Sequence, residues 1–477
     1  MPLLNHKNMS KLYIFAIGGT GSRILRSLTM MLATGVKIGA DEIVPIIIDP
    51  DQANADLTRT VSLLNDYNEI HTNLSFSKEN RSLFFRTGIT KILPNYTLHI
   101  KDTDNKTFRQ FISYAGMSKE NKALTKMLFS DKNLNSYMDV GFKGNPNIGS
   151  VVLNQIAHSE DFDKVTNDFS EGDRIFIISS IFGGTGASGF PLLLKTLRNG
   201  NNFPNFSIIN HSTIGALTVL PYFKVQMDDE SEIDSTTFIG KTKSALAYYE
   251  NNIANNGSID ALYYLGDLVS NTYDNNEGGA SQQNDAHLIE FLGATAIINF
   301  SNSKFTDTSH FEVGIKDGEG AVTFNSLYKK LRGMLYSPMV QFTLMANALT
   351  FNLDFYRSNT FSANNAYFNN LYDSLFFNSL YDFFNKYKHW LEELKKNKRS
   401  LNLFNLNTGN KPFELVTDIK PKSNFNFQNL FNSDYEIFTG NLNKAAKKLC
   451  KSKEPEDRFL EMFYLATEEL INQKLKN

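Results

Sequence analysis

Two apolar segments that end directly in glycine-rich loops constrain the fold of this chain more than any other feature. Residues 12–17 precede the loop 18–22 (Gly-Gly-Thr-Gly-Ser), and residues 174–179 precede the loop 183–189 (Gly-Gly-Thr-Gly-Ala-Ser-Gly). A short, continuous apolar segment is typical of a strand that is buried on both faces of a parallel sheet. Apolar residues at helical spacing follow each loop, so the sequence twice predicts a strand, a tight loop and a helix.

Further segments extend this pattern over the first 305 residues. Apolar runs predict three more strands, at residues 43–48, 214–219 and 261–265, and helical spacing predicts helices at about 21–34, 149–160, 190–198 and 285–300. Alternating strands and helices are typical of an α/β domain with a parallel sheet. Residues 60–140 carry no motif, and the polar, Gly-, Asn- and Gln-rich residues 270–283 predict a loop or disordered segment.

The character of the sequence changes near residue 305. A short β-like stretch at 310–324 precedes long helical patterns at about 326–350, 364–397 and 440–475. We therefore predict an α/β domain over residues 1–305 and a mainly α-helical C-terminal domain over residues 306–477. The aromatic-rich segment 366–390 predicts a helix buried on most faces, with a partner or filament contact as the alternative.

Composition narrows the class of protein. The chain has 477 residues, of which 41% are apolar and 21% charged, as in ordinary soluble proteins. A net charge of −2 does not favour a nucleic-acid or membrane partner. The single cysteine, Cys450, cannot build a disulfide framework. Together with the lack of a signal-peptide-like start or a long apolar run, it favours a cytoplasmic location.

The two glycine loops predict a polyphosphate site. Glycines at a helix N-terminus let the backbone approach an anion, and free N–H groups and the helix dipole favour negative charge there. Thr185 and Ser188 add hydroxyl donors. No Gly-Lys-Ser/Thr follows at P-loop spacing, which argues against a Walker-type loop. A Rossmann-type NAD-binding enzyme stays open as an alternative, because Asp49-Pro50-Asp51-Gln52 follows the second strand where a ribose is bound.

Six segments, taken in order, resemble those of the tubulin/FtsZ superfamily. They are the first loop at 16–21, Ile48-Asp49-Pro50-Asp51-Gln52-Ala53, Gly141 to Gly149, the signature-like segment 181–191, Thr218-Val219-Leu220-Pro221-Tyr222, and Asn284-Asp285. The resemblance covers about residues 11–305 and does not extend to the C-terminal part. It departs from the family at Phe182, where a first glycine is expected, and at Leu220, where tubulins place a glutamate. The chain therefore looks like a divergent bacterial tubulin-like protein.

The resemblance implies GTP or GDP as the ligand, with Mg²⁺ as an accompanying ion, in a parallel-sheet tubulin/FtsZ-like domain followed by a mainly helical region. The implied nucleotide-binding residues are Gly18, Gly19, Thr20, Gly21, Ser22, Asp49, Asp51, Gln52, Gly144, Asn145, Pro146, Gly183, Gly184, Thr185, Gly186, Ala187, Ser188, Asn284 and Asp285.

Hydrolysis in this family uses an acidic loop that enters the nucleotide site of the next subunit in a filament. The resemblance places Asp307 at its first acid position and His310 at the second, with Phe305 in place of an asparagine. It thus implies a self-assembling protein with slow or impaired GTP hydrolysis. The open alternatives are an ordinary polar surface loop here, and a non-hydrolysing scaffold that binds a protein partner through the helical C-terminal region.

Overall fold

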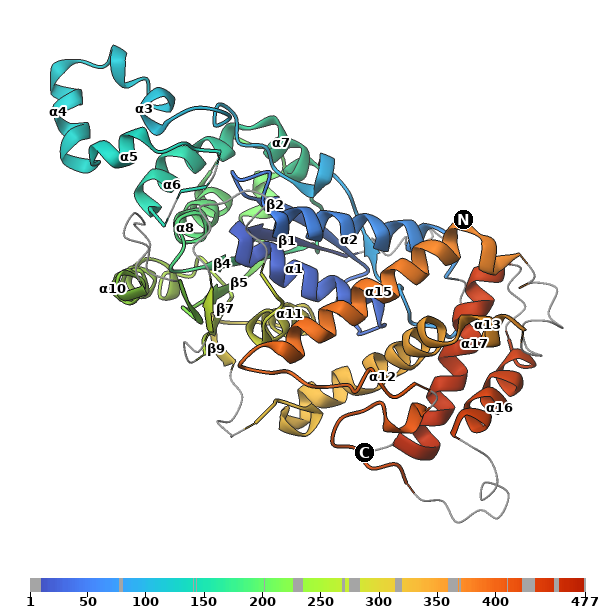
Figure 1. The fold of residues 1–477 in the computed structure, drawn as a ribbon. Coiled ribbons are helices and arrows are strands. Elements are labelled where there is room, and N and C mark those ends of the chain that lie inside the picture. Colours follow the sequence, from blue (N-terminus) through green and yellow to red (C-terminus); the bar gives the residue numbers. More distant parts are fainter. Residues whose placement is uncertain are drawn as a thin grey trace, which may run out of the picture.

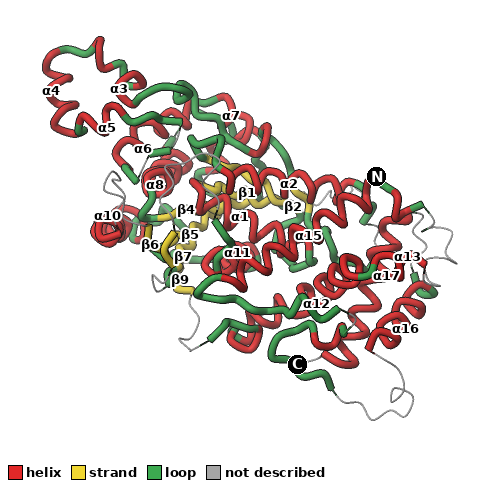
Figure 2. Tube along the Cα trace, in the orientation of Figure 1, coloured by secondary structure: helices red, strands yellow, loops and turns green. Residues whose placement is uncertain are grey.

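The computed structural model is built around a sheet of seven strands, with helices packed around it (Figures 1 and 2). The structure describes residues 10–76, 80–139, 141–142, 144–200, 202–225, 235–267, 271–273, 284–313, 320–358, 368, 370–409, 411–422, 434–449 and 454–475. The strands of the sheet, all parallel, are β1 (Lys11–Ile17), β2 (Glu42–Ile48), β3 (Gly88–Ile89), β4 (Arg174–Ser180), β5 (Thr213–Val219), β7 (Ala261–Leu265) and β9 (Ser309–Val313). Their order is β3-β2-β1-β4-β5-β7-β9, which confirms the predicted α/β class.

The continuous apolar runs become strands because both sheet faces are covered. Six of the seven residues in each of β1, β2, β4 and β5 are buried. Pro45 is tolerated inside β2 because β3 is only two residues long. On the side of β2 that faces β3, the carbonyls of Ile43 and Ile47 accept hydrogen bonds from Thr90 N and Leu98 N. The nitrogen of Pro45, which carries no hydrogen to donate, lies between these two bonds.

Two central helices are buried almost all round. They are α1 (Gly18–Ala33), in which Gly19 is the one residue not buried, and α11 (Leu288–Ser301), in which it is Asn299. α1 packs between α2 (Ala55–Thr72) and α11. The turn into α1 is tight: a Cβ on Gly21 would lie 2.6 Å from the carbonyl carbon of Ala16, so only glycine fits there.

Further helices surround this core. They are α6 (Pro146–Leu153), α7 (Glu160–Asn167), α8 (Gly184–Asn199), α9 (Phe206–Ile209) and α10 (Ser235–Tyr249). A lobe formed by α3 (Phe108–Phe111), α4 (Lys119–Leu128) and α5 (Asp131–Asn135) projects from the body, at the upper left of Figure 1. Two backbone bonds close its base, from Phe108 N to Ser136 O and from Met138 N to Lys106 O, each 2.9 Å long.

The C-terminal region is helical, as predicted. Its helices are α12 (Lys329–Phe351), α13 (Leu353–Ser358), α15 (Leu375–Lys396), α16 (Asp434–Ala446) and α17 (Pro455–Leu470). Aromatic side chains fill its interior, and α15 is buried along the face that carries Phe376, Phe383, Tyr387 and Trp390. This bears out the prediction of a largely buried aromatic helix. The boundary at residue 305 stays a prediction.

Some element boundaries differ from the sequence prediction, each for a local reason. α15 begins only at Leu375 because the Ser374 side chain caps it, accepting from Phe377 N at 3.2 Å. The predicted helix at 440–475 is two helices, since α16 ends at Ala446 and Pro455 starts α17. Within 270–283, residues 271–273 form β8 (Asn271–Tyr273), which pairs with β6 (Phe223–Val225). Residues 274–283 and 364–367 lie outside the described part.

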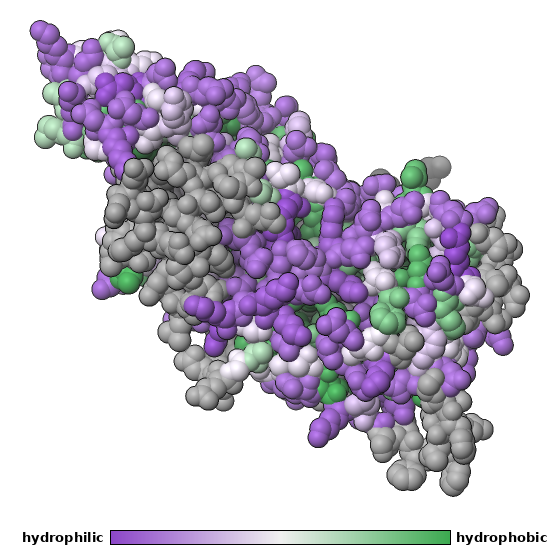
Figure 3. Space-filling view, viewed as in Figure 1, coloured by the Kyte–Doolittle hydropathy of each residue, from purple (hydrophilic) through white to green (hydrophobic). Residues whose placement is uncertain are grey.

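The described surface is mostly hydrophilic on the face shown in Figure 3. Hydrophobic exceptions include Leu124, Met127 and Leu128, which are exposed on α4. No described helix combines the length and the apolar character needed to span a membrane.

We expect Phe342→Ala to lower the free energy of unfolding by about 3–5 kcal/mol, the usual cost of emptying an aromatic core position. The Phe342 ring is fully buried and lies 5.3 Å from Phe84 and 5.7 Å from Phe85, which precede β3, and 5.3 Å from Phe384 of α15. Because these contacts join the two regions, urea unfolding followed by circular dichroism and by the fluorescence of Trp390, the single tryptophan, should give coincident transitions.

The matched control is Phe351→Ala on the same helix, whose side chain is 57% exposed and whose loss should change stability by about 1 kcal/mol or less. Two separate transitions, with the Trp390 signal offset from the circular dichroism, would instead show that the regions unfold independently.

Candidate nucleotide site

The glycine loops meet where the strand order reverses. β1 and β4 are neighbours, but the chain continues from β1 to β2 on one side and from β4 to β5 on the other. Ligands of open α/β sheets bind at the carboxyl ends of the strands at such a point. A Cβ placed on Gly18 would lie 3.6 Å from the Cβ of Thr185 and 3.9 Å from the amide nitrogen of Gly186. The N-termini of α1 and α8 are therefore side by side.

A third predicted loop joins them. A Cβ on Gly184 would lie 3.2 Å from the amide nitrogen of Gly144 and 3.1 Å from that of Asn145. Asn145 caps α6 through its side chain, which accepts from Asn147 N at 3.2 Å, and Pro146 is the first residue of that helix. Lys241 of α10 donates to Gly144 O at 2.6 Å and brings a cation to the loop. Three helix N-termini and a lysine thus converge.

The hydroxyl groups of these loops are not equivalent. Ser22 donates to Gly18 O at 3.4 Å, and Ser188 donates to Gly184 O at 2.7 Å, so both hydroxyls are engaged with their own helices. Both side chains are buried. Gly19, Gly183, Thr185 and Ala187 are partly exposed, whereas Gly21 is buried in the turn. The geometry therefore favours main-chain amides and Thr185 over the two serines as groups that reach a ligand.

The loop after β2 folds on itself. Asp49 accepts from Asp51 N at 3.1 Å, Asp51 accepts from Ala53 N at 3.2 Å, and the exposed Gln52 donates to Asp49 O at 2.6 Å. Asp49 and Asp51 are 4% and 3% exposed. Burial raises the pKa of Asp49 to about 7. The hydrogen bond from Asp51 N lowers this pKa in part, whereas the negative charge of Asp51 raises it further. The protonated and ionised forms of Asp49 are thus both populated near pH 7.

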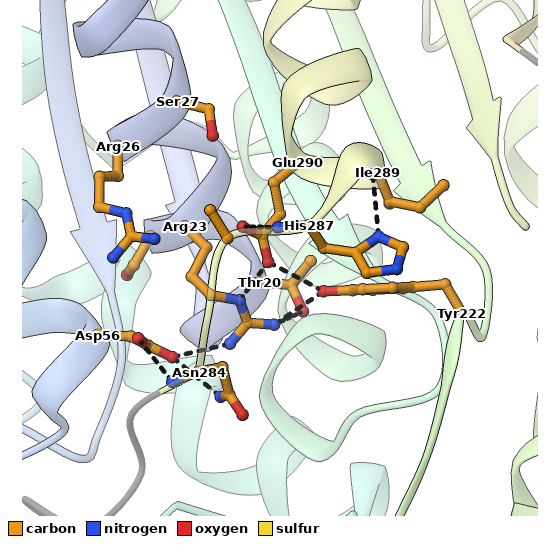
Figure 4. A network of polar contacts seen from close by, with 12 residues as sticks. Thr20, Arg23, Arg26, Ser27, Asp56, Tyr222, Asn284, His287, Ile289 and Glu290 are labelled. Atoms are coloured by element: carbon orange, nitrogen blue, oxygen red, sulfur yellow. Dashed lines mark hydrogen bonds and ion pairs between the residues drawn. The ribbon is translucent and has the colours of Figure 1, made fainter. Parts of the chain in front are cut away.

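An ion network under the first loop was missed by the sequence analysis (Figure 4). Arg23, in the second turn of α1, donates to Glu290 Oε1 at 2.6 Å, to Asp56 Oδ2 at 3.0 Å and to Tyr222 Oη at 2.9 Å. All four side chains are buried. Burial alone lowers the pKa of Arg23, but Tyr222, Glu290 and Asp56 outweigh it and raise the pKa further above its usual value. A signal was present in the sequence: arginines at 23 and 26 interrupt an apolar helix.

The N-terminus of α11 closes this side of the site. Asn284 donates from its backbone and side-chain nitrogens to Asp56, at 3.3 and 3.0 Å, while Asp285 is exposed. His287 caps α11 by accepting from Ile289 N at 3.1 Å. Burial, with Arg23 and Arg399 nearby, lowers the pKa of His287 to about 4, so the ring is neutral. Of the predicted pair, Asn284 is therefore the one held in place.

The departures from the family pattern have structural explanations. Phe182 is buried, with its ring centroid 5.5 Å from that of Phe223 and 6.3 Å from that of Tyr222. Leu220 packs over Gly266, where a Cβ would approach its side chain to 3.2 Å. Both substitutions thus take part in packing behind the loops.

Asp307 and His310 lie at the end of the sheet opposite the glycine loops. Asp307 precedes β9, whereas the glycine loops follow β1 and β4, and all these strands are parallel. Ser309 N bonds to Asp260 O, just before β7, which places the loop at the amino ends of the strands. Asp307 and His310 are exposed, and the His310 ring stacks on Tyr264 at 6.3 Å. Within one chain they do not meet the candidate site.

Among the described residues, no three His, Cys, Asp or Glu side chains are grouped so as to hold a metal ion by themselves. Mg²⁺ stays a prediction, because this ion is commonly held by phosphates with only one or two carboxylates.

We expect Asp49→Asn to flatten part of the pH dependence of stability. A carboxyl whose pKa rises from 3.8 unfolded to about 7 folded favours the native state below pH 4, and this contribution is lost as the pH rises through 7. Relative to wild type, the variant should therefore gain up to about 4 kcal/mol between pH 4 and pH 8. Urea unfolding at several pH values measures this, and parallel wild-type and variant profiles would contradict it.

Comparison with known proteins gives only distant likenesses. No protein-family model matches the chain, and no curated protein matches it. A GTPγS-bound protofilament of CetZ2 from Haloferax volcanii has a TM-score of 0.26 and 15% identity, with 54% of this chain and 49% of that chain covered. CetZ from Methanosaeta thermophila has a TM-score of 0.28 and 16% identity, with 54% and 46% covered. The match thus spans about half the length of each CetZ chain.

A GTPγS-form protofilament of TubZ from Bacillus thuringiensis serovar israelensis has a TM-score of 0.26 and 12% identity, with 80% of this chain and 82% of that chain covered. With TM-scores below 0.5, these likenesses do not bear on what this chain binds.

Proposed function

We propose that this chain is a tubulin/FtsZ-like protein that binds a guanine nucleotide at the carboxyl ends of β1 and β4. The observation that carries the proposal is the convergence of three loops, marked by Gly18, Gly184 and Asn145, at the N-termini of α1, α8 and α6. The N-terminus of a helix carries a partial positive charge, which suits a chain of phosphates. Lys241 adds a full positive charge beside Gly144.

The two ends of the site suit different parts of a nucleotide. Backbone groups dominate near Gly144, Gly184 and Thr185, which fits phosphate oxygens. Side chains dominate near Asp56 and Asn284, where an amide can read a base edge. We propose that Asp49, Asp51 and Gln52 border the nucleotide between these ends, with Asp285 at the rim.

The opposite positions of the glycine loops and Asp307 support a proposal of self-assembly. Asp307 reaches a nucleotide only if a second copy stacks head to tail, and such contacts generate open filaments rather than closed dimers. We propose this arrangement, with slow hydrolysis because a single carboxylate and His310 stand where the family has two acids.

A non-hydrolysing scaffold is the second candidate, and one observation favours it. Phe305 occupies the position of the family's asparagine, and its ring stacks on Phe300 with centroids 5.5 Å apart. An aromatic side chain packed against the core cannot orient a water molecule as an amide does. In that case the helical C-terminal region would recruit a protein partner.

We expect Gly19→Asp to weaken GTP binding by at least about tenfold. A Cβ at Gly19 meets Arg23 Nη1 at 3.5 Å and Asn54 Nδ2 at 3.8 Å, which are ordinary contacts, so the fold should accept the change. The added carboxylate would lie beside the phosphates. Two like charges about 4 Å apart near a protein surface repel by several kcal/mol. Calorimetric titration with GTP, ATP and NAD measures the effect and the ligand preference.

The matched control is Gly19→Asn, which has the same shape without the charge and should bind GTP several-fold more tightly than Gly19→Asp. Equal affinities for the two variants would argue against phosphates at this loop. A wild-type preference for NAD would favour the dinucleotide-binding enzyme, whose strand order is the same. Chromatography of nucleotide released by denaturing the purified protein provides an independent identification.

We expect Asp307→Ala to bind GTP like wild type but to lose any hydrolysis that rises with protein concentration. Because the two surfaces belong to different subunits, mixing Asp307→Ala with Gly19→Asp should restore hydrolysis, since each supplies the surface that the other lacks. Phosphate release and light scattering follow hydrolysis and assembly. Tight GTP binding by wild type without hydrolysis or assembly would support the scaffold instead.

A further inference from the structure

A carboxylate from the C-terminal region lies next to the part of the candidate site formed by Asp56 and Asn284, where we propose that the base binds. Glu393 of α15 is 2% exposed and binds Arg26 Nη2 at 2.8 Å, Arg59 Nη2, and the backbone nitrogen of Ala286 at 3.1 Å. One turn later, Asn397 donates to Ala286 O. The segment before α11 is thus held by α15 through both its N–H and its C=O groups.

Arg59 links Glu393 to Asn284. Its guanidinium bonds to Glu393 on one side and donates to Asn284 O at 3.3 Å on the other. Asp56, one turn earlier on α2, accepts from both nitrogens of Asn284. Asn284 is therefore fixed at its carbonyl by Arg59 and at its amide by Asp56.

This clamp determines which way the Asn284 amide faces. With Nδ2 committed to Asp56, a flip would turn Oδ1 toward a carboxylate and is disfavoured by repulsion. No described residue bonds to Oδ1, and Asn284 is partly exposed. The site thus offers an acceptor to its ligand, which suits the adjacent N–H donors on the edge of guanine.

We propose that Glu393 is a positioning residue for base recognition, acting through Arg59 and Ala286 on Asn284. The inference rests on the proposed nucleotide function and deepens it, because it makes the helical C-terminal region part of nucleotide selection. Coupling between sites is reciprocal, so nucleotide binding also stabilises the docking of α15.

The test compares GTP with inorganic tripolyphosphate, which lacks the base. In the full-length protein, Glu393→Gln is expected to weaken GTP binding about tenfold to a hundredfold and to leave tripolyphosphate binding within about twofold of wild type. Its matched control is Glu392→Gln, the neighbouring, partly exposed carboxylate, which should bind both ligands like wild type. Calorimetric titration gives the affinities.

A second variant covers the case in which Glu393→Gln does not fold. Arg26 is buried, and Glu393 is its hydrogen-bond partner among the described side chains, so losing that charge has a structural cost. The Arg59 side chain is 24% exposed, and Arg59→Gln breaks the same relay near the surface. It should also weaken GTP while sparing tripolyphosphate, and GTP should protect α15 amides from hydrogen exchange in wild type but not in this variant.

Equal loss of GTP and tripolyphosphate binding in Arg59→Gln, or unchanged GTP binding, would overturn the role of Glu393. Failure of the proposed function looks different, because wild type would then bind neither GTP nor tripolyphosphate.

Discussion

The buried guanidinium of Arg23 is the interaction on which the candidate site depends. A cation removed from water costs several kcal/mol unless opposite charges surround it. Those charges come from Asp56 of α2 and Glu290 of α11, so burying Arg23 sets three helices at fixed positions around one side chain. Arg26 and Arg59 extend the cluster through Glu393 of α15. Three arginines thus meet three carboxyl groups in one cluster.

This cluster separates what the sequence can predict from what it cannot. The strands and the glycine loops are local features, because an apolar run and the glycines beside it lie within a few residues of each other. The partners of Arg23 and Arg26 are distant: Glu290 is 267 residues from Arg23, and Glu393 is 367 residues from Arg26. A single sequence shows that these arginines need partners, but only the fold selects them.

The two ends of the candidate site also differ in how they tolerate substitution. The end marked by Gly144, Gly184 and Thr185, for which we propose phosphate binding, is built largely from main-chain groups, which survive side-chain changes. This explains how Phe182 can stand in place of a glycine while the helix ends still converge. The end marked by Asp56 and Asn284, for which we propose base recognition, is built from side chains in a charge network, where one missing partner leaves a buried charge uncompensated. Substitutions there should be far less tolerated.

The lobe between β3 and α6 has an architectural consequence. Its two chain ends are bonded together at residues 106–108 and 136–138, and Phe108, Leu134 and Met138 are buried beside this junction. When the two ends of a segment lie side by side, residues can be inserted into it or deleted from it without moving the rest of the fold. The lobe is therefore a place where insertions or deletions would change the surface of the protein while the sheet and its loops stay the same.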